Sequence, residues 1–529
     1  MAKDAVKNHK ILLLALVAAL GLSLHGASWG KVECWNPDQM AFRPVPSNLL
    51  VGDYLKPPLD TYLNRLLVLN PVDIVMNGIL KTASPVRMKA RLIGCRLVTA
   101  FMFCCSVALL YFSILRCSGR QAASLSALVM ATSAGLITFN HYGTADAPLL
   151  FWMLGSFASA IVFGISGRLP YALASGLLAG LAAADKYNGV LVAVALPVCA
   201  LIAQGAMAAF DRKAWLGMLC VPLGFVIGCP GAVFEWGKFS QDFLYNLHVT
   251  PVYAGNDCSP GYLKFLGKFP ELLGYPCSLL LLIGFISLPI IIAKGCLSRK
   301  EFMLVIAALT VFSVYFLSIG KFPRIETRFV LPAAPFAFMV AAPAVARIRR
   351  GWVVVLATPL IVYNVVCSVL VGERFLHDPR MAACEWADSN LKPGMTIESA
   401  YAPSWSLLVT GVRNTPMPEA TGRAERFKKM MGSNAAVQRG VEKYEKPPPA
   451  GFFSKEGLRE RDPDYVSFSS LAVGLSGTKE ARTYFSDLLQ EKMGYSKVFE
   501  AHWKSGLWWA YPKKLDFVPD AMVILRKTS

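Results

Sequence analysis

The chain of 529 residues is 55% hydrophobic and only 16% charged, with a mean hydropathy of +0.46. A single water-soluble core of this size does not need so much apolar surface, so most of the chain is expected to lie in lipid. The net charge of +19 would suggest nucleic-acid binding in a soluble protein. Here much of the basic surplus falls in short segments between apolar runs, which favours membrane topology and phospholipid contacts over nucleic acid.

Eleven apolar stretches are long enough to cross about 30 Å of hydrocarbon. They lie near residues 11–28, 92–115, 121–139, 147–165, 169–184, 187–205, 214–233, 272–293, 301–319, 329–347 and 351–371. The two stretches beside Asp185 are each short, so a single broken helix is the competing interpretation there. The sequence therefore predicts an all-α polytopic membrane domain over residues 1–371, with about eleven transmembrane helices.

Lysine and arginine recur at every second boundary between these stretches, and this pattern orients a membrane protein by the positive-inside rule. The basic residues are Lys3, Lys7, Lys10, Arg116, Arg120, Arg168, Arg212, Lys213, Lys294, Arg299, Lys300, Arg347, Arg349 and Arg350. We therefore expect a multi-pass protein of the plasma (inner) membrane with a cytoplasmic N-terminus. The first stretch is expected to stay as an anchor, although Gly26-Ala27-Ser28 leaves a cleaved signal peptide as the alternative.

With this topology, several loops and the whole tail face outward. They are residues 29–90, 140–147, 234–271, 320–328 and 372–529. The tail is soluble in composition and has three strand-like runs and one helical run. These are Tyr465 to Ser469, Lys497 to Ala501, Met522 to Leu525 and Thr478 to Met493. The pattern predicts a soluble extracytoplasmic α/β domain over residues 372–529.

The first outer loop, residues 29–90, contains Cys34-Trp35-Asn36-Pro37-Asp38-Gln39. Asparagine and proline favour a turn that would hold the Asp38 carboxylate over the membrane surface. A positioned aspartate can take the proton of an attacking hydroxyl, so Asp38 is the first choice for a catalytic base. The alternative is an aspartate that only initiates the following turn.

Further along this loop, Lys56 precedes Pro57 and Pro58 and is followed by amphipathic stretches at residues 62–69 and 72–80. Such stretches lie flat at a membrane interface. A lysine stiffened by two prolines suits the binding of a lipid phosphate as a point charge. A Lys-Pro-Pro turn in a solvated loop would look the same in sequence.

Ionisable residues gather at the outward helix ends, where charge is costly unless it faces a cavity or a partner. They are Asp38, Lys56, Arg96, Asp146, Asp185, Lys186, Arg324 and Arg328. We expect them to converge on one outward-facing cavity, where cations would stabilise a phosphate leaving group. The alternative is that each basic side chain reaches water at the interface. His141 is expected to be a hydrogen-bonding helix cap rather than a ligand.

The 13 cysteines do not form a disulfide pattern. Most lie in or beside apolar runs and are expected to be small core residues. Cys34, Cys258 and Cys384 fall in outward segments, yet no spacing identifies a pair among them. Zinc-type cysteine or histidine spacing is also missing from the sequence.

In their order and spacing, these residues resemble the GT-C superfamily of polyprenyl-phosphate-sugar glycosyltransferases. The group most similar holds protein O-mannosyltransferases and the aminoarabinose transferase of lipid A. The similarity spans about residues 10–400. Its local matches are the acidic motif at Asp38, Lys56-Pro57-Pro58-Leu59, Arg96, Asp146, Gly180-Leu181 to Lys186-Tyr187-Asn188, and Arg328-Phe329-Val330-Leu331-Pro332.

The resemblance implies a GT-C-like fold with Asp38 as catalytic base and Asp146 as a catalytic helper that binds acceptor or sugar. It implies that a set of cations binds the donor phosphate, namely Lys56, Arg96, Lys186 and Arg328, with Arg324 adding charge at the same level. Many relatives have glutamate where this chain has Gln39 and threonine where it has Asp185. The second departure suggests that Lys186 is neutralised by a local ion pair.

The implied reaction is inverting displacement at the anomeric carbon of a polyprenyl-phosphate sugar by an acceptor hydroxyl of a lipid, glycan or protein. One base is enough for inversion. No cofactor is assigned; a divalent metal is allowed but not indicated, since the outer loops contain no Asp-x-Asp pair.

Two other function classes stay open. A polytopic transporter or lipid flippase also carries buried charges, but the sequence lacks the two similar halves that transporters commonly show. A non-catalytic scaffold whose tail binds envelope partners is the third interpretation.

Overall fold

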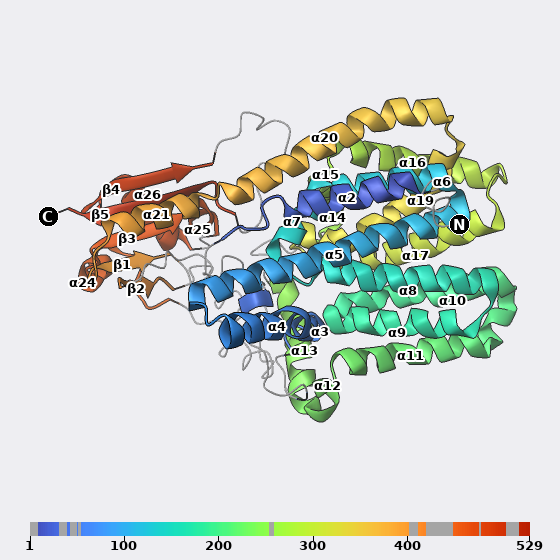
Figure 1. The fold of residues 1–529 in the computed structure, drawn as a ribbon, viewed down its shortest axis with the longest axis horizontal. Helices are drawn as coiled ribbons and strands as arrows, with labels where there is room; N and C mark the ends of the chain where they lie inside the picture. The colour runs from blue at the N-terminus through green and yellow to red at the C-terminus, as the bar shows by residue number, and fades with distance from the viewer. Residues whose placement is uncertain are drawn as a thin grey trace. The chain divides into compact units, whose positions relative to one another are not determined.

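The structure, a computed structural model, describes residues 9–30, 40–42, 50, 54–252, 259–400, 411–418, 448–475, 478–503 and 518–528. The chain divides into two compact units (Figure 1). The first, called here the helical unit, comprises Met1–Ala27, Arg43–Phe243 and Ser259–Gly372. The second, called the sheet unit, comprises Ser28–Phe42, Leu244–Cys258 and Glu373–Ser529.

The helical unit consists of helices and their connections. Two of these helices, α13 and α20, continue into the sheet unit. The longer ones are α2 (Lys10–Leu24), α5 (Ser84–Ser118), α6 (Arg120–Thr132), α8 (Asp146–Ser166), α9 (Leu169–Asp185), α10 (Ala195–Gln204), α11 (Arg212–Gly228), α13 (Trp236–Val252), α16 (Tyr275–Ala293), α17 (Arg299–Gly320), α19 (Ala334–Arg347) and α20 (Arg350–Leu376). The short ones are α3 (Leu59–Asn64), α4 (Asn70–Asp73), α7 (Ala134–Tyr142), α12 (Gly231–Phe234), α14 (Tyr262–Gly267), α15 (Phe269–Leu273) and α18 (Thr327–Val330). Turns of π-helix form η2 (Arg65–Leu69) and η3 (Ile74–Ile79), and 3-10 turns form η4 (Tyr187–Val194), η5 (Gly205–Phe210) and η6 (Leu331–Ala333).

Seven helical stretches among the described residues are long and apolar enough to cross a membrane. They are Ser84–Ser118, Asp146–Ser166, Tyr187–Phe210, Tyr275–Ala293, Arg299–Gly320, Thr327–Arg347 and Arg350–Asn390. The helices α6 and α7, bent by 51°, add an eighth if they count as one span. The other three predicted segments are the shorter helices α2, α9 and α11, of 15, 17 and 17 residues. Every predicted segment is therefore helical, while seven or eight reach the length of a full span.

Local sequence signals explain where several of these helices begin and end. Asp146 opens α8, where a carboxylate is favourable beside the free N–H groups. The Ser298 side chain accepts from the backbone N–H of Glu301, and the Glu301 side chain accepts from Ser298 in return. This capping box starts α17. The connection between α6 and α7 is Ser133, whose hydroxyl donates to Val129 O at 2.6 Å.

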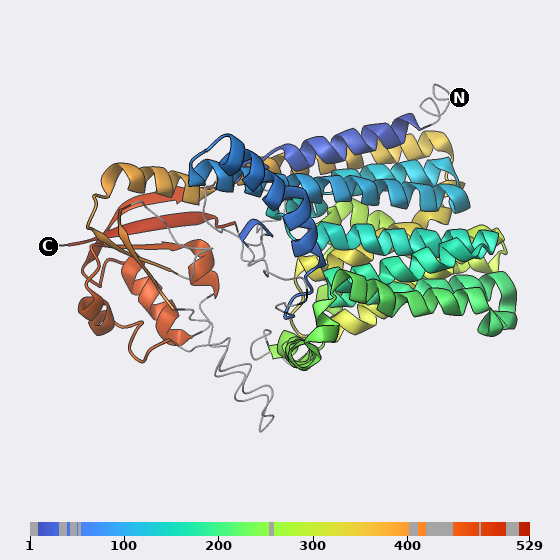
Figure 2. The ribbon, with the colours of Figure 1, turned by 60° about the horizontal axis from the view of Figure 1, so that its bottom comes forward.

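The helices α9 and α11 pack unusually closely, and this contact fixes the position of α9. A Cβ atom at Gly176 would lie 1.7 Å from Gly217 O, so only glycine allows this approach. Small residues are the usual means by which helices in lipid come together. The helices α8 to α11, coloured cyan to green, lie side by side in Figure 1 and Figure 2.

At Asp185 the chain forms two helices rather than one broken helix. The helix α9 ends there, Lys186 is extended, and η4 folds back against α9. The return is tight, because a Cβ at Gly189 would lie 2.4 Å from Ala182 O. Lys186 therefore lies at the tip of a helical hairpin.

The basic connections gather at the other end of the bundle. Hydrogen bonds and an ion pair join the connections that follow α5, α8, η5, α16 and α19. The contacts are Gln121 Nε2 to Ile348 O (2.7 Å), Arg347 Nη1 to Glu301 Oε1 (2.9 Å), Arg299 Nη2 to Ile202 O (3.1 Å) and Lys213 Nζ to Gly167 O (2.8 Å). Most of the lysines and arginines from which the membrane orientation was predicted lie in or beside these connections.

The sheet unit contains a five-stranded sheet of order β2-β1-β3-β5-β4 in the described part of the chain. The strands are β1 (Thr396–Ser399), β2 (Arg413–Pro416), β3 (Tyr465–Ser469), β4 (Tyr495–His502) and β5 (Ala521–Lys527). The helical pieces are η1 (Met40–Phe42), α21 (Pro379–Asn390), α24 (Lys455–Arg461), α25 (Ser470–Leu475) and α26 (Lys479–Leu489). Strands β1, β2 and β3 pair in parallel, whereas β5 is antiparallel to both β3 and β4.

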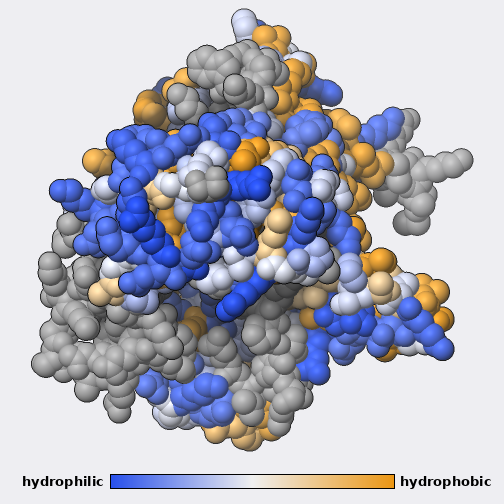
Figure 3. Space-filling model, turned by 90° about the vertical axis from the view of Figure 1, so that its left-hand side faces the viewer, coloured by the Kyte–Doolittle hydropathy of each residue, from blue (hydrophilic) through white to orange (hydrophobic). Residues whose placement is uncertain are grey.

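Strand β3 has the predicted bounds, and β4, β5 and α26 lie at the other predicted positions. The strands β1 and β2 were not predicted, because each is only four residues long and β1 buries a charged residue, Glu398. The helix α26 packs Phe485 and Leu488 into the core of the unit. Hydrophilic residues dominate the face drawn in Figure 3, which includes this unit.

Candidate functional site

Asp38, the predicted catalytic base, lies outside the described residues, as do Cys34, Gln39 and Cys258. The other predicted site residues all belong to the helical unit. Their geometry defines the candidate site.

Asp146 and Lys186 form the centre of this site. Lys186 Nζ and Asp146 Oδ1 make an ion pair, and Thr144 Oγ1 donates to Asp146 Oδ2 at 2.7 Å. The Asp146 side chain is 5% exposed, whereas that of Lys186 is 28% exposed. Lys186 thus pairs with a residue 40 positions away instead of its neighbour Asp185, so the expected local ion pair is wrong. Adjacent residues at the end of a helix do not face each other, which explains the choice of partner.

The turn before α8 packs against Arg96. Gly143 ends α7 with φ of 61°, a left-handed conformation that suits glycine. A Cβ at this position would lie 3.4 Å from Arg96 Cγ. The Arg96 side chain is buried and donates from Nη1 to Ala27 O at 2.7 Å. Arg96 therefore connects α5 to the end of α2 and supports the turn that carries Asp146.

His141 and Asn140 tie the same turn to α2. The ring nitrogens of His141 lie 2.8 Å from Ile137 O and 2.6 Å from His25 O. Asn140 Nδ2 donates to Ser23 Oγ at 2.8 Å. These contacts agree with the hydrogen-bonding role expected for His141.

Asn188 and Tyr315 complete the surroundings of Asp146. Asn188 Nδ2 donates to Tyr315 Oη at 2.6 Å, and Tyr315 is fully buried in α17. The Asp146 carboxylate lies within electrostatic range of the Tyr315 hydroxyl. The sequence analysis missed Tyr315, whose only signal was a polar group within an apolar stretch.

The segment that carries Lys56 is fixed beside the end of α9. Tyr187 Oη donates to Tyr54 O at 2.6 Å. The neighbouring prolines are buried, while the Lys56 side chain is exposed. Because Tyr187 follows Lys186 and Tyr54 lies two residues before Lys56, the structure brings the segments of both lysines together.

Two acidic residues that the sequence analysis missed hold Tyr54 in place. Tyr54 Oη donates to Glu235 Oε2 at 2.8 Å, and Tyr54 N donates to Asp242 Oδ2 at 3.3 Å. Burial and the hydrogen bond to Glu235 raise the pKa of Tyr54. The rings of Tyr54 and Tyr187 both pack edge-on against Phe239. The signal for Glu235 and Asp242 was their place in a predicted outer loop.

Arg324 and Arg328 share one carboxylate, that of Glu326. Arg328 Nε lies 2.6 Å from Glu326 Oε2, and Arg324 pairs with the same side chain. Burial alone would raise the pKa of Glu326, but the charges of Arg328 and Arg324 outweigh it and hold this pKa below its ordinary value. Glu326 thus holds both guanidinium groups in one cluster.

Glu271 and Lys268 lie next to this cluster. Thr327 Oγ1 donates to Glu271 Oε2 at 2.9 Å, and Lys268 Nζ lies 2.7 Å from the same carboxylate. The helix α15, which carries Glu271, packs on α7, and η6 packs on α8. The cluster is therefore built on elements that also support the Asp146 turn.

Within the described ranges, no group of three histidine, cysteine, aspartate or glutamate residues is placed to hold a metal ion. Cys384 is a buried cysteine in the sheet unit. Cys95, Cys199 and Cys229 are buried in the helical unit, as expected for core residues.

Comparison with known proteins gives one match in sequence. A family model described as dolichyl-phosphate-mannose-protein mannosyltransferase matches residues 75–228. This region contains Arg96, Asp146 and Lys186. A search of curated proteins finds no match.

Two solved structures of ArnT from Cupriavidus metallidurans have a similar fold over nearly their whole length. The apo structure is 14% identical, covers 97% of each chain and has a TM-score of 0.54. The structure bound to undecaprenyl phosphate is 13% identical, covers 99% of this chain and 98% of that chain, and has a TM-score of 0.50. Over residues 75–228 the chain is therefore similar to this mannosyltransferase family, and its fold is similar to that of ArnT.

Proposed function

We propose that the protein is an inverting glycosyltransferase that moves a sugar from a polyprenyl-phosphate carrier to an acceptor hydroxyl on the outer face of the membrane. The observation that carries this proposal is the convergence of the Asp146–Lys186 ion pair and the Lys56 segment at the tip of the α9 hairpin. A similar fold binds undecaprenyl phosphate in ArnT, which supports a lipid-phosphate donor.

The partly exposed Lys186 and the exposed Lys56 would bind the donor phosphate. As the bond from the anomeric carbon to the phosphate oxygen breaks, negative charge grows on the leaving phosphate, and the lysines stabilise it. The acceptor oxygen forms the new bond from the opposite side, and its proton passes to Asp38. Asp146 holds Lys186 in position and orients the sugar or the acceptor.

The arginines would act at longer range. Arg324 and Arg328 add positive potential that attracts the carrier phosphate toward the lysines. Arg96 is shielded from solvent, so its contribution is to support the Asp146 turn and to add positive potential behind it.

The length of α8 supports an outward-facing site. Asp146 begins this helix and Gly167 follows its end, where the basic connections meet. A helix of 21 residues is about 30 Å long, which is the thickness of the hydrocarbon layer. By the positive-inside rule the basic connections face the cytoplasm. The site then faces outward, as does the tail at residues 372–529.

The loop at residues 29–90 is proposed to lie on the outer interface. Leu66 is 66% exposed, Ile74 65% and Ile79 69%, all in the π-helical turns η2 and η3 or the short helix between them. Such apolar side chains are stable when they enter the boundary of the acyl chains.

The test is transfer by the purified full-length protein in proteoliposomes. The vesicles contain labelled undecaprenyl- or dolichyl-phosphate sugars, and extracted envelope lipids, glycans and proteins serve as acceptors. We expect transfer with inversion of the anomeric configuration, and we expect Asp38→Asn to abolish it while the protein stays folded. Movement of lipid or solute without sugar transfer would favour the transporter or flippase alternative and overturn the proposal.

A further inference from the structure

The tip of the α9 hairpin is held by a helix that lies far along the chain. Asn188 follows Lys186 by two residues, and its Nδ2 donates to Tyr315 Oη at 2.6 Å. Tyr315 belongs to α17 and is completely buried. The 3-10 segment η4, which contains Asn188, packs on α17 as well as on α8 and α9. One side-chain hydrogen bond thus joins the tip to a residue 127 positions away.

The backbone around Lys186 is fixed within the hairpin itself. Lys186 is extended, with φ of −143° and ψ of 134°, and it connects two helical segments. Its N–H donates to Ala182 O at 2.9 Å, and its carbonyl accepts from Gly189 N at 2.8 Å. These bonds hold Lys186 relative to α9, but neither of them holds it relative to the neighbouring helices. Contacts from side chains are needed for that.

Two side-chain contacts hold the tip from neighbouring helices. One is the ion pair of Lys186 with Asp146 at the start of α8, and the other is the bond between Asn188 and Tyr315. A phosphate that binds Lys186 shares its ammonium group with the Asp146 carboxylate, and the two anions repel each other, so the ion pair weakens. The bond to Tyr315 does not involve this ammonium group. It is therefore the restraint that remains while Lys186 binds an anion.

The surroundings of Asn188 argue against a purely structural role for this residue. Within the described part of the chain, Asn188 Oδ1 has no hydrogen-bond partner, and it is shielded from solvent. A buried polar atom without a partner lowers stability, and a pair of apolar side chains of similar shape would avoid this cost. The asparagine is therefore expected to serve the position of the tip more than the stability of the fold.

We propose that Tyr315 and Asn188 are positioning residues for the transfer reaction. Their hydrogen bond holds the tip of the α9 hairpin on α17 and keeps the Lys186 ammonium beside Asp146, where the donor phosphate binds. A lysine side chain has many rotamers, so a fixed backbone position reduces the entropy that is lost when the side chain binds phosphate. This inference rests on the proposed function and on Lys186 as a ligand of the donor phosphate.

The test compares Tyr315→Phe with a matched control in the same unit, Tyr111→Phe. Tyr111 is also buried in a long helix, α5, and its Oη lies 3.0 Å from His9 Nδ1. Each substitution therefore removes one buried hydroxyl that binds one nitrogen. Tyr111 lies about two turns before the end of α5 at Ser118, where the basic connections gather. A general effect of losing a buried hydroxyl should be the same in both variants.

Transfer by the purified protein in proteoliposomes is the first measurement. Tyr315→Phe and Asn188→Leu are each expected to lower kcat/KM for the donor about tenfold, whereas Tyr111→Phe should keep the wild-type value. The double variant should lose no more than either single variant, because both substitutions break the same bond. In a Lys186→Gln background, Tyr315→Phe should cause no further loss. The double variant should also keep the wild-type melting temperature, because the removal of both partners leaves no new polar group without its bond.

The second measurement reports the position of Lys186 without any need for transfer. It is the rate at which an acylating reagent labels the Lys186 amine, read by mass spectrometry of the purified protein. This rate should rise in Tyr315→Phe and in Asn188→Leu, because Lys186 then leaves Asp146 more often. It should stay unchanged in Tyr111→Phe.

Equal transfer by Tyr315→Phe and Tyr111→Phe, an additive loss in the Lys186→Gln background, or an unchanged labelling rate would overturn the inference and leave the proposed function intact. Absence of transfer by the wild-type protein would overturn the proposed function instead. In that case the labelling rate still decides whether Asn188 and Tyr315 hold Lys186 in place.

Discussion

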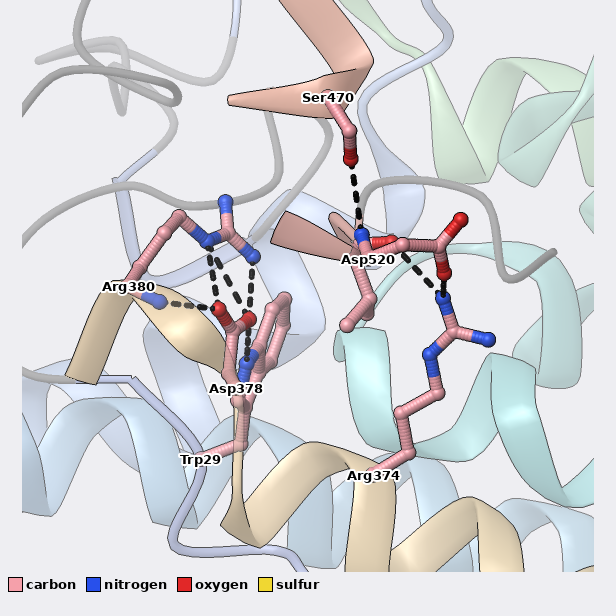
Figure 4. A network of polar contacts seen from close by, with 7 residues as sticks. Trp29, Arg374, Asp378, Arg380, Ser470 and Asp520 are labelled. Carbon is pink, nitrogen blue, oxygen red and sulfur yellow. Dashed lines mark hydrogen bonds and ion pairs between the residues drawn. The ribbon is translucent and has the colours of Figure 1, made fainter. Parts of the chain in front are cut away.

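Each unit contains a buried carboxylate that binds one cation and one neutral donor, and the two differ in their access to solvent. In the helical unit Asp146 binds Lys186 and Thr144. In the sheet unit Asp378 binds Arg380 and Trp29 (Figure 4). The Lys186 side chain is 28% exposed, but that of Arg380 is only 2% exposed.

This difference separates a pair that can bind a ligand from a pair that can only hold structure. A cation in contact with solvent can accept a second anion such as a phosphate without further burial. A sealed cation would first have to be exposed, which costs the desolvated contacts around it. The Asp146–Lys186 pair is therefore accessible to a ligand, whereas the Asp378–Arg380 pair contributes to structure.

The largest effect is expected at the Asp378–Arg380 pair, which is called here the sealed pair because solvent does not reach it. Asp378→Ala removes a fully buried carboxylate that binds the Arg380 guanidinium, which should lower the free energy of unfolding by about 3–5 kcal/mol. Thermal unfolding of the purified protein in detergent measures the loss. Lys527→Ala is the control, because its ion pair with Asp462 is largely exposed and should contribute under about 1 kcal/mol. Similar losses in the two variants would contradict the distinction between sealed and open pairs.

At the Asp146–Lys186 pair, which is called here the open pair because Lys186 is partly exposed, the main loss should be in transfer activity. Lys186→Gln removes the charge that is proposed to bind the donor phosphate, so transfer should fall about a hundredfold. Stability should also fall, because Asp146 stays buried without a charged partner, but by less than at the Asp378–Arg380 pair, since Asp146 keeps its hydrogen bond from Thr144 and Lys186 is partly exposed. The measurement is kcat/KM for the lipid-phosphate donor.

The control for this lysine is Lys213→Gln. Lys213 also donates to a partner, Gly167 O, but it lies among the basic connections at the other end of α8. Its substitution should leave transfer unchanged. Unchanged transfer by Lys186→Gln would remove Lys186 from the site.

A smaller effect is expected at Lys56, which is exposed. Lys56→Ala should raise the KM for donor about tenfold with kcat nearly unchanged, because the lysine is proposed to act as a point charge on the carrier phosphate. Titration of the donor at saturating acceptor gives both constants. A change in the KM for acceptor alone would assign Lys56 to the other substrate.

The smallest expected effect is a pH dependence at Glu326. Its pKa is lowered in the folded protein, so its ion pairs stabilise the fold above the ordinary carboxylate value of 4.5, and this contribution is lost as the pH falls through the lowered pKa. Glu326→Gln should be less stable than wild type by about 1 kcal/mol at pH 7. Thermal unfolding is measured from pH 7 to pH 3. The difference in stability between the two proteins should shrink toward the acid end of this range. A constant difference over this range would contradict the assigned cause.

Much of the helical unit could be predicted from local pattern. All eleven apolar stretches are helices, and Asp146 and Lys186 lie at helix ends as expected. Apolar runs of this length must be helical in lipid, because the backbone has no water to bind and satisfies its hydrogen bonds internally. The lengths of α2, α9 and α11 could not be predicted as well, since hydropathy does not show where a turn begins.

The partners of the charged residues could not be predicted in the same way. Glu326 between Arg324 and Arg328 was overlooked although it is their shared partner. Tyr54, Glu235 and Asp242 are far apart in the chain or lie in a loop without periodicity. The hydrogen bond between Trp29 and Asp378 spans 349 positions.

By itself, the sequence determined that this is a helical membrane protein, where its apolar helices lie and which residue types gather at their ends. Those properties follow from the local free energy of burying backbone and side chains in lipid. The tertiary structure alone decided that Lys186 pairs with Asp146 and that Trp29 belongs with Asp378. An ion pair or hydrogen bond depends on where two distant segments meet, and the packing of helices and strands sets that meeting point.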